Sequence, residues 1–305
     1  MKYQSLGIIG SGNHFNNKIK PVLKKNKFFK ISGYLKRKNL KKNYFTEKEF
    51  FEKKFDFVYI SCPNELHEKY IVKALNSGFN VICEKPFLTK SNNLKKIIQL
   101  STKKNKLIFE CFMYVYHPVF SYIKALIESK KLGPIQYVIS SFKFPSLEKN
   151  NNRYSKKLGN GFFYDAAVYP LSLENYLFNF KSKLNVTQKT FKNTVDLNGY
   201  ILLENKSTRR FYFWGEGQNY SNNLEIFFKK GSLYVDKFFS KPPKKSIFVK
   251  IQLNKKEIIK KFKPSDHFEN MFKVIEKKYK SKSFLKKNRE LISNHYNLID
   301  LVKSS

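Results

Sequence analysis

Cysteine, arginine and long apolar runs are all scarce in this 305-residue chain. The three cysteines, Cys62, Cys83 and Cys111, form no CxxC pair and fall in or just after predicted strands. We therefore expect reduced packing residues, with no disulfide framework and no metal site. No stretch approaches the roughly 20 apolar residues of a membrane span. The opening MKYQSLGIIG leads straight into a strand, so a secretory signal is not expected and a cytoplasmic location is predicted.

The scarcity of arginine bears on the meaning of the charge. The formal net charge is +37, but five of the 60 basic residues are arginine and the other 55 are lysine. Base readout and bidentate phosphate binding favour arginine, and the lysines are spread along the whole chain. The charge therefore does not predict specific nucleic-acid binding, although nonspecific adhesion to polyanions at low salt is expected. It does favour an anionic cofactor or a phosphorylated substrate.

The chain is long enough for two domains, and 41% hydrophobic residues indicate a globular protein. A predicted strand at 5–9 is followed at once by Gly10-Ser11-Gly12 and then by a helix. Glycine at such a turn lets the backbone approach a pyrophosphate, and the free N–H groups of the helix N-terminus attract its charge. Phe15 stands where a GxGxxG motif has its third small residue.

The stretch 55–88 reads as strand, helix, strand, and the rest of the chain is organised around it. Residues 57–62 are nearly all apolar, as expected of a parallel strand buried on both faces. A second strand at 79–83 delivers Glu84-Lys85-Pro86 at its carboxyl end. Because ligands of open α/β sheets bind outside that edge, Lys85 is a candidate for the chemistry. Taken alone, it could equally be a solvated lysine in a turn.

A strand at 28–35 ends in Lys36-Arg37-Lys38. An NAD site usually has an acidic residue here for the ribose 2′-hydroxyl, whereas a basic residue accommodates the 2′-phosphate of NADP. The sequence therefore predicts that NADP(H) is preferred, with Arg37 as the phosphate contact, and NAD(H) stays possible. Only 46–51 looks helical before the next strand, so one face of the sheet is predicted to be thinly covered.

The hydrophobic periodicity changes from Ile135 onward, and the domain boundary is expected near 112–118. A helix at 119–129 is followed by several short strands with polar turns, and two helices close the chain at 267–279 and 289–302. We predict an α/β protein with an N-terminal Rossmann dinucleotide-binding domain, residues 1–115. Residues 116–305 are predicted to form an α+β domain with a large, mostly antiparallel open sheet. The strands expected in it are 136–144, 195–203, 209–214, 224–228, 232–235 and 247–253.

The segment 158–178 is the second informative stretch. Its glycines precede a helix on which Asp165 and Tyr169 stand four residues apart, and hence on one face. A phenol is a weak acid at neutral pH, but a nearby ammonium stabilises its phenolate. Lys85 could supply that ammonium and Asp165 could orient the pair, in the crevice between domains where substrates commonly bind. Read alone, the segment could be a helix with a buried tyrosine and a solvated aspartate.

Together these residues resemble the glucose–fructose oxidoreductase/inositol dehydrogenase/rhizopine catabolism (Gfo/Idh/MocA) family of two-domain NAD(P)-dependent oxidoreductases. The signatures are the GxG turn, PNELH at 63–67, EKP at 84–86 and the glycine-rich segment leading to Asp165 and Tyr169. The stretches 110–118, 151–172 and 222–243 look like the nucleotide-sugar 3-ketoreductases of deoxysugar biosynthesis. The departures from the family pattern are Phe15, the shortened second crossover, and Asn160 and Ala167 in place of glycine.

The resemblance implies that Lys85 and Tyr169 are the catalytic pair and that Asp165 assists them. The substrate would contact these three residues and Arg153, which would bind a phosphate. His67 would line the nicotinamide end of the cofactor. A solvent-facing helix residue and a surface arginine are the alternatives for His67 and Arg153. The cofactor-binding residues implied are Gly10, Gly12, Asn13, His14, Arg37, Cys62, Pro63, His67, Glu84 and Lys85.

The resulting hypothesis is a reductase for the keto group of a sugar, expected to be nucleotide-linked. Tyr169 would donate the proton, and Lys85 would stabilise the developing alkoxide. The alternatives are a dehydrogenase of a free sugar, polyol or diol, and a non-catalytic dinucleotide-binding regulator. Two helices cannot cover both faces of the predicted antiparallel sheet, so we expect a homodimer or homotetramer through strands of 195–253. The sequence leaves open the sugar, the carbonyl position and the direction.

Overall fold

The computed structural model describes residues 3–36, 43–155, 161–178, 183–192, 195–205 and 208–304. The chain divides into two compact units. The first comprises Met1–Phe112 and Met271–Ser293, and the second comprises Met113–Asn270 and Asn294–Ser305. Each unit is built on one large sheet. The predicted fold class, a parallel Rossmann sheet plus a mostly antiparallel sheet, is confirmed.

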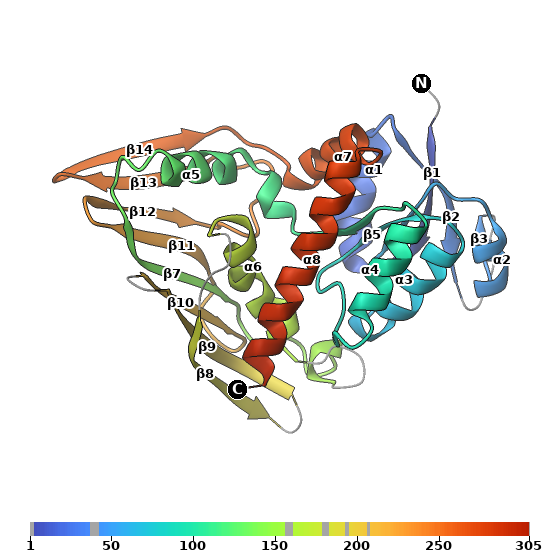
Figure 1. The fold of residues 1–305 in the computed structure, drawn as a ribbon, viewed down its shortest axis with the longest axis horizontal. Coiled ribbons are helices and arrows are strands. Elements are labelled where there is room, and N and C mark those ends of the chain that lie inside the picture. The colour runs from blue at the N-terminus through green and yellow to red at the C-terminus, as the bar shows by residue number, and fades with distance from the viewer. Residues whose placement is uncertain are drawn as a thin grey trace. The chain divides into compact units, whose positions relative to one another are not determined.

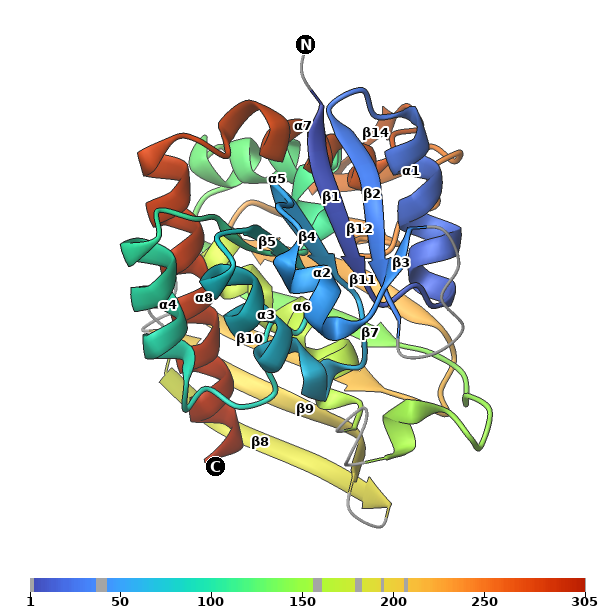
Figure 2. The same cartoon turned by 90° about the vertical axis from the view of Figure 1, so that its right-hand side faces the viewer.

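The sheet of the first unit is parallel, with the order β3-β2-β1-β4-β5-β6 among the described residues. Strands β1 to β5 of this sheet are labelled in Figure 2. The order reverses between β1 and β4, which is the switch point where open α/β sheets bind ligands. Strands β4 and β5 are buried along their whole length, as parallel strands covered on both faces are. The strands are β1 Gln4–Ile9, β2 Phe29–Leu35, β3 Tyr44–Phe45, β4 Phe57–Ile60, β5 Asn80–Cys83 and β6 Ile108–Glu110.

Helices cover both faces of this parallel sheet. Alternate side chains of β4 point to opposite faces, and Phe57 and Tyr59 share one of them. Their rings pack 5.0 Å from Tyr279 and 6.2 Å from Phe272, on or just after helix α7. The prediction of a thinly covered face is therefore wrong, because a helix from the far end of the chain fills it. The helices are α1 Lys20–Lys25, α2 Glu47–Glu52, α3 His67–Asn76, α4 Leu94–Lys103 and α7 His267–Lys278.

The sheet of the second unit has the order β14-β13-β12-β11-β7-β10-β9-β8 among the described residues (Figure 1). Its neighbours are antiparallel, except that β7 and β10 run parallel. The strands are β7 Ile135–Lys143, β8 Lys183–Lys192, β9 Val195–Asn205, β10 Thr208–Gly215, β11 Ser221–Phe228, β12 Gly231–Asp236, β13 Ile247–Leu253 and β14 Lys256–Phe262. The helices of this part of the chain are α5 Pro118–Glu128, α6 Val168–Tyr176 and α8 Lys282–Lys303, and α8 runs through both units.

Helices pack on one face of the antiparallel sheet, whereas the described residues of the other face include exposed aromatic side chains. Helix α6 lies against β7 and β10, and β11 alternates strictly between buried and half-buried residues. Tyr137 and Phe248, whose side chains belong to the other face, are 41% and 47% exposed.

In the part of the chain that is described, every helix falls short of the length and hydrophobicity needed to cross a bilayer.

Candidate active site

The glycine turn after β1 is shaped by close backbone packing. Gly10 has φ +92°, and a Cβ atom there would lie 2.4 Å from the backbone nitrogen of Cys62. The Ser61 hydroxyl donates to the Gly10 carbonyl oxygen at 2.6 Å. A Cβ atom on Gly12 would meet no atom within 4 Å, so its outer side is open. A tight turn with an open flank before a helix fits the pyrophosphate of a dinucleotide.

Phe15, the departure from the glycine motif, packs into the core beneath this turn. It is fully buried, and its ring centroid lies 6.3 Å from that of Tyr34 and 6.0 Å from that of Tyr59. The helix accommodates it through a π-helical turn, Phe15–Ile19, which runs into α1. The larger residue therefore fills core volume and leaves the open flank of Gly12 unchanged.

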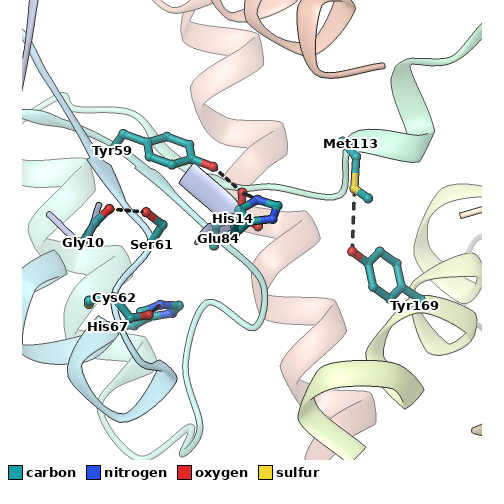
Figure 3. Close-up of polar contacts among 9 residues, drawn as sticks. All are labelled: Gly10, His14, Tyr59, Ser61, Cys62, His67, Glu84, Met113 and Tyr169. Carbon is teal, nitrogen blue, oxygen red and sulfur yellow. Dashed lines mark hydrogen bonds and ion pairs between the residues drawn. The ribbon is translucent and has the colours of Figure 1, made fainter. Parts of the chain in front are cut away.

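Glu84 connects the glycine turn to the EKP segment (Figure 3). Its Oε1 atom lies 3.1 Å from Nε2 of His14 and accepts a hydrogen bond from the Tyr59 hydroxyl. Burial alone would raise the pKa of Glu84, but the charge and hydrogen bond of His14 prevail and lower it. Burial alone would lower the pKa of His14, but Glu84 prevails and raises it. The two groups thus form a partly buried ion pair.

Lys85 follows Glu84, and a second acid lies close to it. The Lys85–Pro86 peptide bond is cis. Glu110, the last residue of β6, accepts the backbone N–H of Phe87 at 2.8 Å. Burial raises the pKa of Glu110 to about 8, and the nearby charge of Lys85 acts against that rise. Sequence reasoning missed Glu110, although an acid at the carboxyl end of a buried parallel strand was the signal to follow.

His67 joins two loops at the same edge of the sheet. It is 1% exposed, so the solvent-facing alternative is wrong. Its Nδ1 lies 2.7 Å from the carbonyl oxygen of Pro86, and its Nε2 lies 3.0 Å from that of Cys62. Burial lowers the pKa of His67. The contacts with the two carbonyl oxygens act against this lowering, because a carbonyl oxygen accepts only from a protonated ring nitrogen.

Tyr169, on helix α6 of the second unit, sits in an aromatic cluster. Its side chain is 6% exposed, and its ring stacks on Phe142 with centroids 4.8 Å apart. Phe239 packs against it at 5.6 Å. The hydroxyl donates to the sulfur of Met113 at 3.7 Å (Figure 3). Thioether sulfur is a weak acceptor, so a stronger acceptor could displace this contact.

Asp165 lies in a π-helical turn, Phe163–Ala167, directly before α6. Its carboxylate is held by Arg153, whose Nε and Nη2 atoms donate to Oδ2 and Oδ1 at 2.6 and 3.2 Å. The predicted phosphate contact, Arg153, is thus paired with Asp165, the residue predicted to assist the catalytic pair. Ala167 is fully buried in the same turn. Gly159 and Asn160 lie outside the described residues.

The start of this helical segment is fixed by Asp196 of strand β9. Gly161 has φ +84°, and a Cβ atom there would lie 2.1 Å from Oδ1 of Asp196. The other carboxylate oxygen accepts the backbone N–H of Phe163 at 2.6 Å and the indole N–H of Trp214 at 3.1 Å. Burial raises the pKa of Asp196, and these hydrogen bonds oppose the rise. Sequence reasoning assigned no role to Asp196.

The structure brings several predicted site residues together within each unit. In the first unit His14 contacts Glu84, and the carbonyl of Cys62 contacts His67. In the second unit Arg153 contacts Asp165. Arg37 lies outside the described residues. The remaining cofactor candidates, Asn13 and Pro63 among them, follow β1, β4 or β5, at the carboxyl edge of the parallel sheet.

Two further features of the sequence are placed by the structure. The ammonium of Lys36, at the end of β2, lies 4.9 Å from the centre of the Tyr44 ring. Cys83 and Cys111 are buried thiols whose pKa values are raised by burial, whereas Cys62 is only half-buried. Among the described residues, no group of three or more His, Cys, Asp or Glu side chains is arranged to hold a metal ion.

Two family models match most of this chain. Residues 5–112 match the oxidoreductase family with an NAD-binding Rossmann fold, and residues 120–234 match the Gfo/Idh/MocA C-terminal domain. The chain belongs to the Gfo/Idh/MocA oxidoreductase family. The resemblance identified from the sequence motifs is confirmed.

Curated relatives include sugar-nucleotide reductases and a diol dehydrogenase. The chain is 26% identical over 200 residues to the dTDP-3,4-didehydro-2,6-dideoxy-alpha-D-glucose 3-reductase of Saccharopolyspora spinosa, covering 65% of this chain and 60% of that enzyme. It is 27% identical over 157 residues to the trans-1,2-dihydrobenzene-1,2-diol dehydrogenase of Xenopus laevis, covering 51% and 47%. The chain thus spans about 60% or less of the length of these curated relatives.

Solved structures show the same fold over the whole chain. A 3-ketoreductase from Actinomadura kijaniata, solved with NADP and TDP-benzene, superposes with a TM-score of 0.91 at 19% identity, covering 99% of this chain and 98% of that one. An aldose–aldose oxidoreductase from Caulobacter crescentus gives a TM-score of 0.82 at 15% identity, with the same coverage. At these identities the likeness concerns the fold.

Proposed function

We propose that this protein is an NADP(H)-dependent reductase of a keto group on a nucleotide-linked sugar. One observation carries the proposal: reductases from Saccharopolyspora spinosa, Streptomyces violaceoruber and Actinomadura kijaniata share one dTDP-sugar 3-reductase activity, and each is 26–27% identical to this chain over 191–200 residues.

The proposed catalytic residues are Lys85, Tyr169 and Asp165. A bound nicotinamide would supply the hydride. Tyr169 donates its phenolic proton to the oxygen that becomes the new hydroxyl, and Lys85 stabilises the negative charge on that oxygen. The Actinomadura ketoreductase has also been solved with a tyrosine replaced by phenylalanine and with a lysine replaced by alanine, which supports attention to these two residue types.

The proposed cofactor site uses the carboxyl edge of the parallel sheet. Gly10 and Gly12 let the backbone and the following helix approach the pyrophosphate, with Asn13 and His14 at its start. The Glu84–His14 ion pair holds the glycine turn next to the EKP turn. Lys36, together with Arg37, suits the 2′-phosphate of NADP, since both are basic where an NAD site has an acid.

A dehydrogenase acting on a diol or polyol is the second candidate function. The diol dehydrogenase of Xenopus laevis and a scyllo-inositol 2-dehydrogenase of Bacillus subtilis are 27% and 25% identical to this chain over 157 and 156 residues. A regulator without activity would need the Rossmann turn for binding the dinucleotide but not the catalytic residues. The presence of Lys85, Asp165 and Tyr169 disfavours that alternative.

We infer that the protein forms a homodimer or homotetramer through its antiparallel sheet. The face of that sheet opposite α6 carries Tyr137 and Phe248, both largely exposed, and half-buried Phe211, Phe213 and Phe227. Pairing two copies through this face would bury the apolar area symmetrically.

The thiol state of the three cysteines fits a reducing compartment such as the cytoplasm.

A turnover assay separates these functions. NADPH consumption is followed with a dTDP-linked 3-keto sugar generated in place, with NADH in a parallel reaction. Reduction of NADP⁺ is followed with free sugars, inositol and diols. The proposal predicts turnover of the dTDP-linked sugar and a preference for NADPH. Turnover of diols or inositol alone would support the second candidate, and cofactor binding without any turnover would support the regulator.

A further inference from the structure

The pairing of Arg153 with Asp165 is the feature of the second unit that the proposed mechanism has not used. Arg153 lies in a single 3-10 turn, Asn152–Tyr154, and its side chain contacts Asp165, which follows twelve residues later in the sequence. Its Nε and Nη2 atoms both face the carboxylate, at 2.6 and 3.2 Å. Its Nη1 atom lies 3.3 Å from the side-chain oxygen of Asn151. Three nitrogens of the guanidinium therefore have described acceptors.

This arrangement occupies one of the two edges through which arginine recognises phosphate, and Asn151 engages Nη1 on the other edge. Arginine binds carboxylate and phosphate through the same planar fork of two parallel N–H bonds. Here the fork formed by Nε and Nη2 is engaged by Asp165. Binding a substrate phosphate through that fork would leave a carboxylate that is only 16% exposed without its partner, and such an exchange is costly. The geometry favours a role within the protein.

The pair is electrostatically connected to Tyr169. The pKa of Arg153 is raised, mainly by the charge of Asp165 and to a smaller extent by Tyr169. Asp165 and Tyr169 stand four residues apart on one helical segment, and their side chains are 16% and 6% exposed, so solvent screens charges at this place little. Other titratable groups beside this cluster are Tyr114, which packs against Tyr169, and Tyr154, which is hydrogen-bonded to Glu216.

The charge of Asp165 beside Tyr169 indicates what Arg153 does. A carboxylate beside a phenol opposes formation of the phenolate, because two negative charges then lie close together. Tyr169 becomes a phenolate when it gives its proton to the substrate. We propose that Arg153 is a positioning residue, which fixes the Asp165 carboxylate and neutralises its charge beside Tyr169. This inference rests on the proposed function of Tyr169 and replaces a phosphate-binding role for Arg153.

Kinetics of a double-mutant cycle test this role. We expect Arg153→Gln to lower kcat by about 10-fold or more, while KM for the nucleotide sugar changes by less than about threefold. The alkaline limb of the kcat profile should move to higher pH, because the uncompensated carboxylate makes Tyr169 a weaker acid. In an Asp165→Asn background the same arginine substitution should change kcat by less than about twofold. Arg153→Lys, which keeps the charge without the fork, should recover part of the loss.

Other outcomes overturn the inference. A raised KM with unchanged kcat, in both backgrounds, would make Arg153 a phosphate contact. No change in either constant would make it a surface arginine. The folding of Arg153→Gln is judged by NADPH affinity and circular dichroism. If it fails to fold, Arg153→Lys takes its place in the same cycle with Asp165→Asn. Additive losses of kcat in that cycle would contradict coupling through Asp165.

A readout without substrate keeps this test separate from the proposed function. The ionisation of Tyr169 is followed by NMR of protein labelled at the tyrosine ζ-carbon, with the signal assigned through Tyr169→Phe. Arg153→Gln should shift that ionisation upward by about half a pH unit or more, and adding Asp165→Asn should reverse the shift. An unshifted titration overturns the inference even if the protein reduces sugars. A shifted one supports it even if the true substrate is different.

Discussion

At the scale of the residue, the candidate site consists of acids and their partners. Glu84, Glu110 and Asp165 are buried or nearly so, and each has a described partner: His14, the N–H of Phe87, and Arg153. The partner decides the charge, since paired Glu84 has a lowered pKa, whereas burial raises the pKa of Glu110 to about 8. The same residue type therefore provides a fixed charge in one place and a protonated carboxyl in another.

Tyr169→Phe removes the proposed proton donor and little volume. We expect kcat to fall by about 100-fold or more, with folding and NADPH affinity retained. Tyr176→Phe, on the same helix, is the matched control and should keep nearly full activity. Steady-state kinetics of both variants check this expectation. Wild-type turnover in well-folded Tyr169→Phe would remove Tyr169 from the mechanism.

Glu110→Gln removes the carboxyl whose pKa burial raises from 4.5 to about 8. Between these values the unfolded chain loses its proton while the folded chain keeps it, so wild-type stability falls as pH rises. Glutamine does not titrate. The difference in the free energy of unfolding, Glu110→Gln minus wild type, should therefore increase as pH rises across this window, by up to about 1.4 kcal/mol per pH unit. Denaturant unfolding of both proteins at several pH values measures it, and a pH-independent difference would contradict it.

Sequence reasoning could propose site residues where a motif or a strand end marked them. Lys85, Asp165 and Tyr169 stood in short patterns that could be read directly. Glu110 and Asp196 did not, because their roles depend on which backbone N–H groups the fold brings to them. The pairing of Arg153 with Asp165 also requires the three-dimensional structure, since nothing in the sequence separates a surface arginine from a paired one.

At the scale of the element, the predicted strands were those with a buried side. Strands β7, β9, β10, β11, β12 and β13 were all placed to within a few residues. Strands β8 and β14 were missed, and both are edges of the antiparallel sheet. In β14 all residues except Phe262 are exposed, and four of its seven residues are charged. Lysine-rich edges resist edge-to-edge pairing, but they carry no hydrophobic alternation for sequence reasoning to detect.

Gly161→Ala tests whether Asp196 fixes the helix that carries Tyr169. The new Cβ would lie 2.1 Å from Oδ1 of Asp196, at φ +84°. We expect kcat to fall by about 10-fold or more and NADPH affinity to be kept, since the glycine turn is in the other unit. Gly78→Ala is the matched control, with φ +80° and no atom within 4 Å of the added Cβ. Equal effects of the two substitutions on kcat would show that the clash with Asp196 is unimportant.

At the scale of the whole molecule, the open face of the antiparallel sheet is the surface that we propose for assembly. Phe248→Lys places a charge on that face, whereas Ile258→Lys alters the opposite side, and the two native side chains are almost equally exposed at 47% and 48%. We expect the wild type and Ile258→Lys to be dimers or tetramers by light scattering, and Phe248→Lys to dissociate at micromolar concentration. A monomeric wild type would contradict the proposed assembly.

Hydride transfer from NADPH to a nucleotide-linked keto sugar is the reaction that we propose. Two samples of NADPH, each deuterated at one face of nicotinamide C4, are incubated separately with the protein and a dTDP-linked 3-keto sugar. Mass spectrometry then measures the deuterium content of the sugar product. The account predicts one deuterium on the reduced sugar carbon, from one of the two faces only, and none with Tyr169→Phe beyond its residual rate. NADPH consumption that leaves the nucleotide sugar unlabelled, or labelling confined to free sugars, would contradict it.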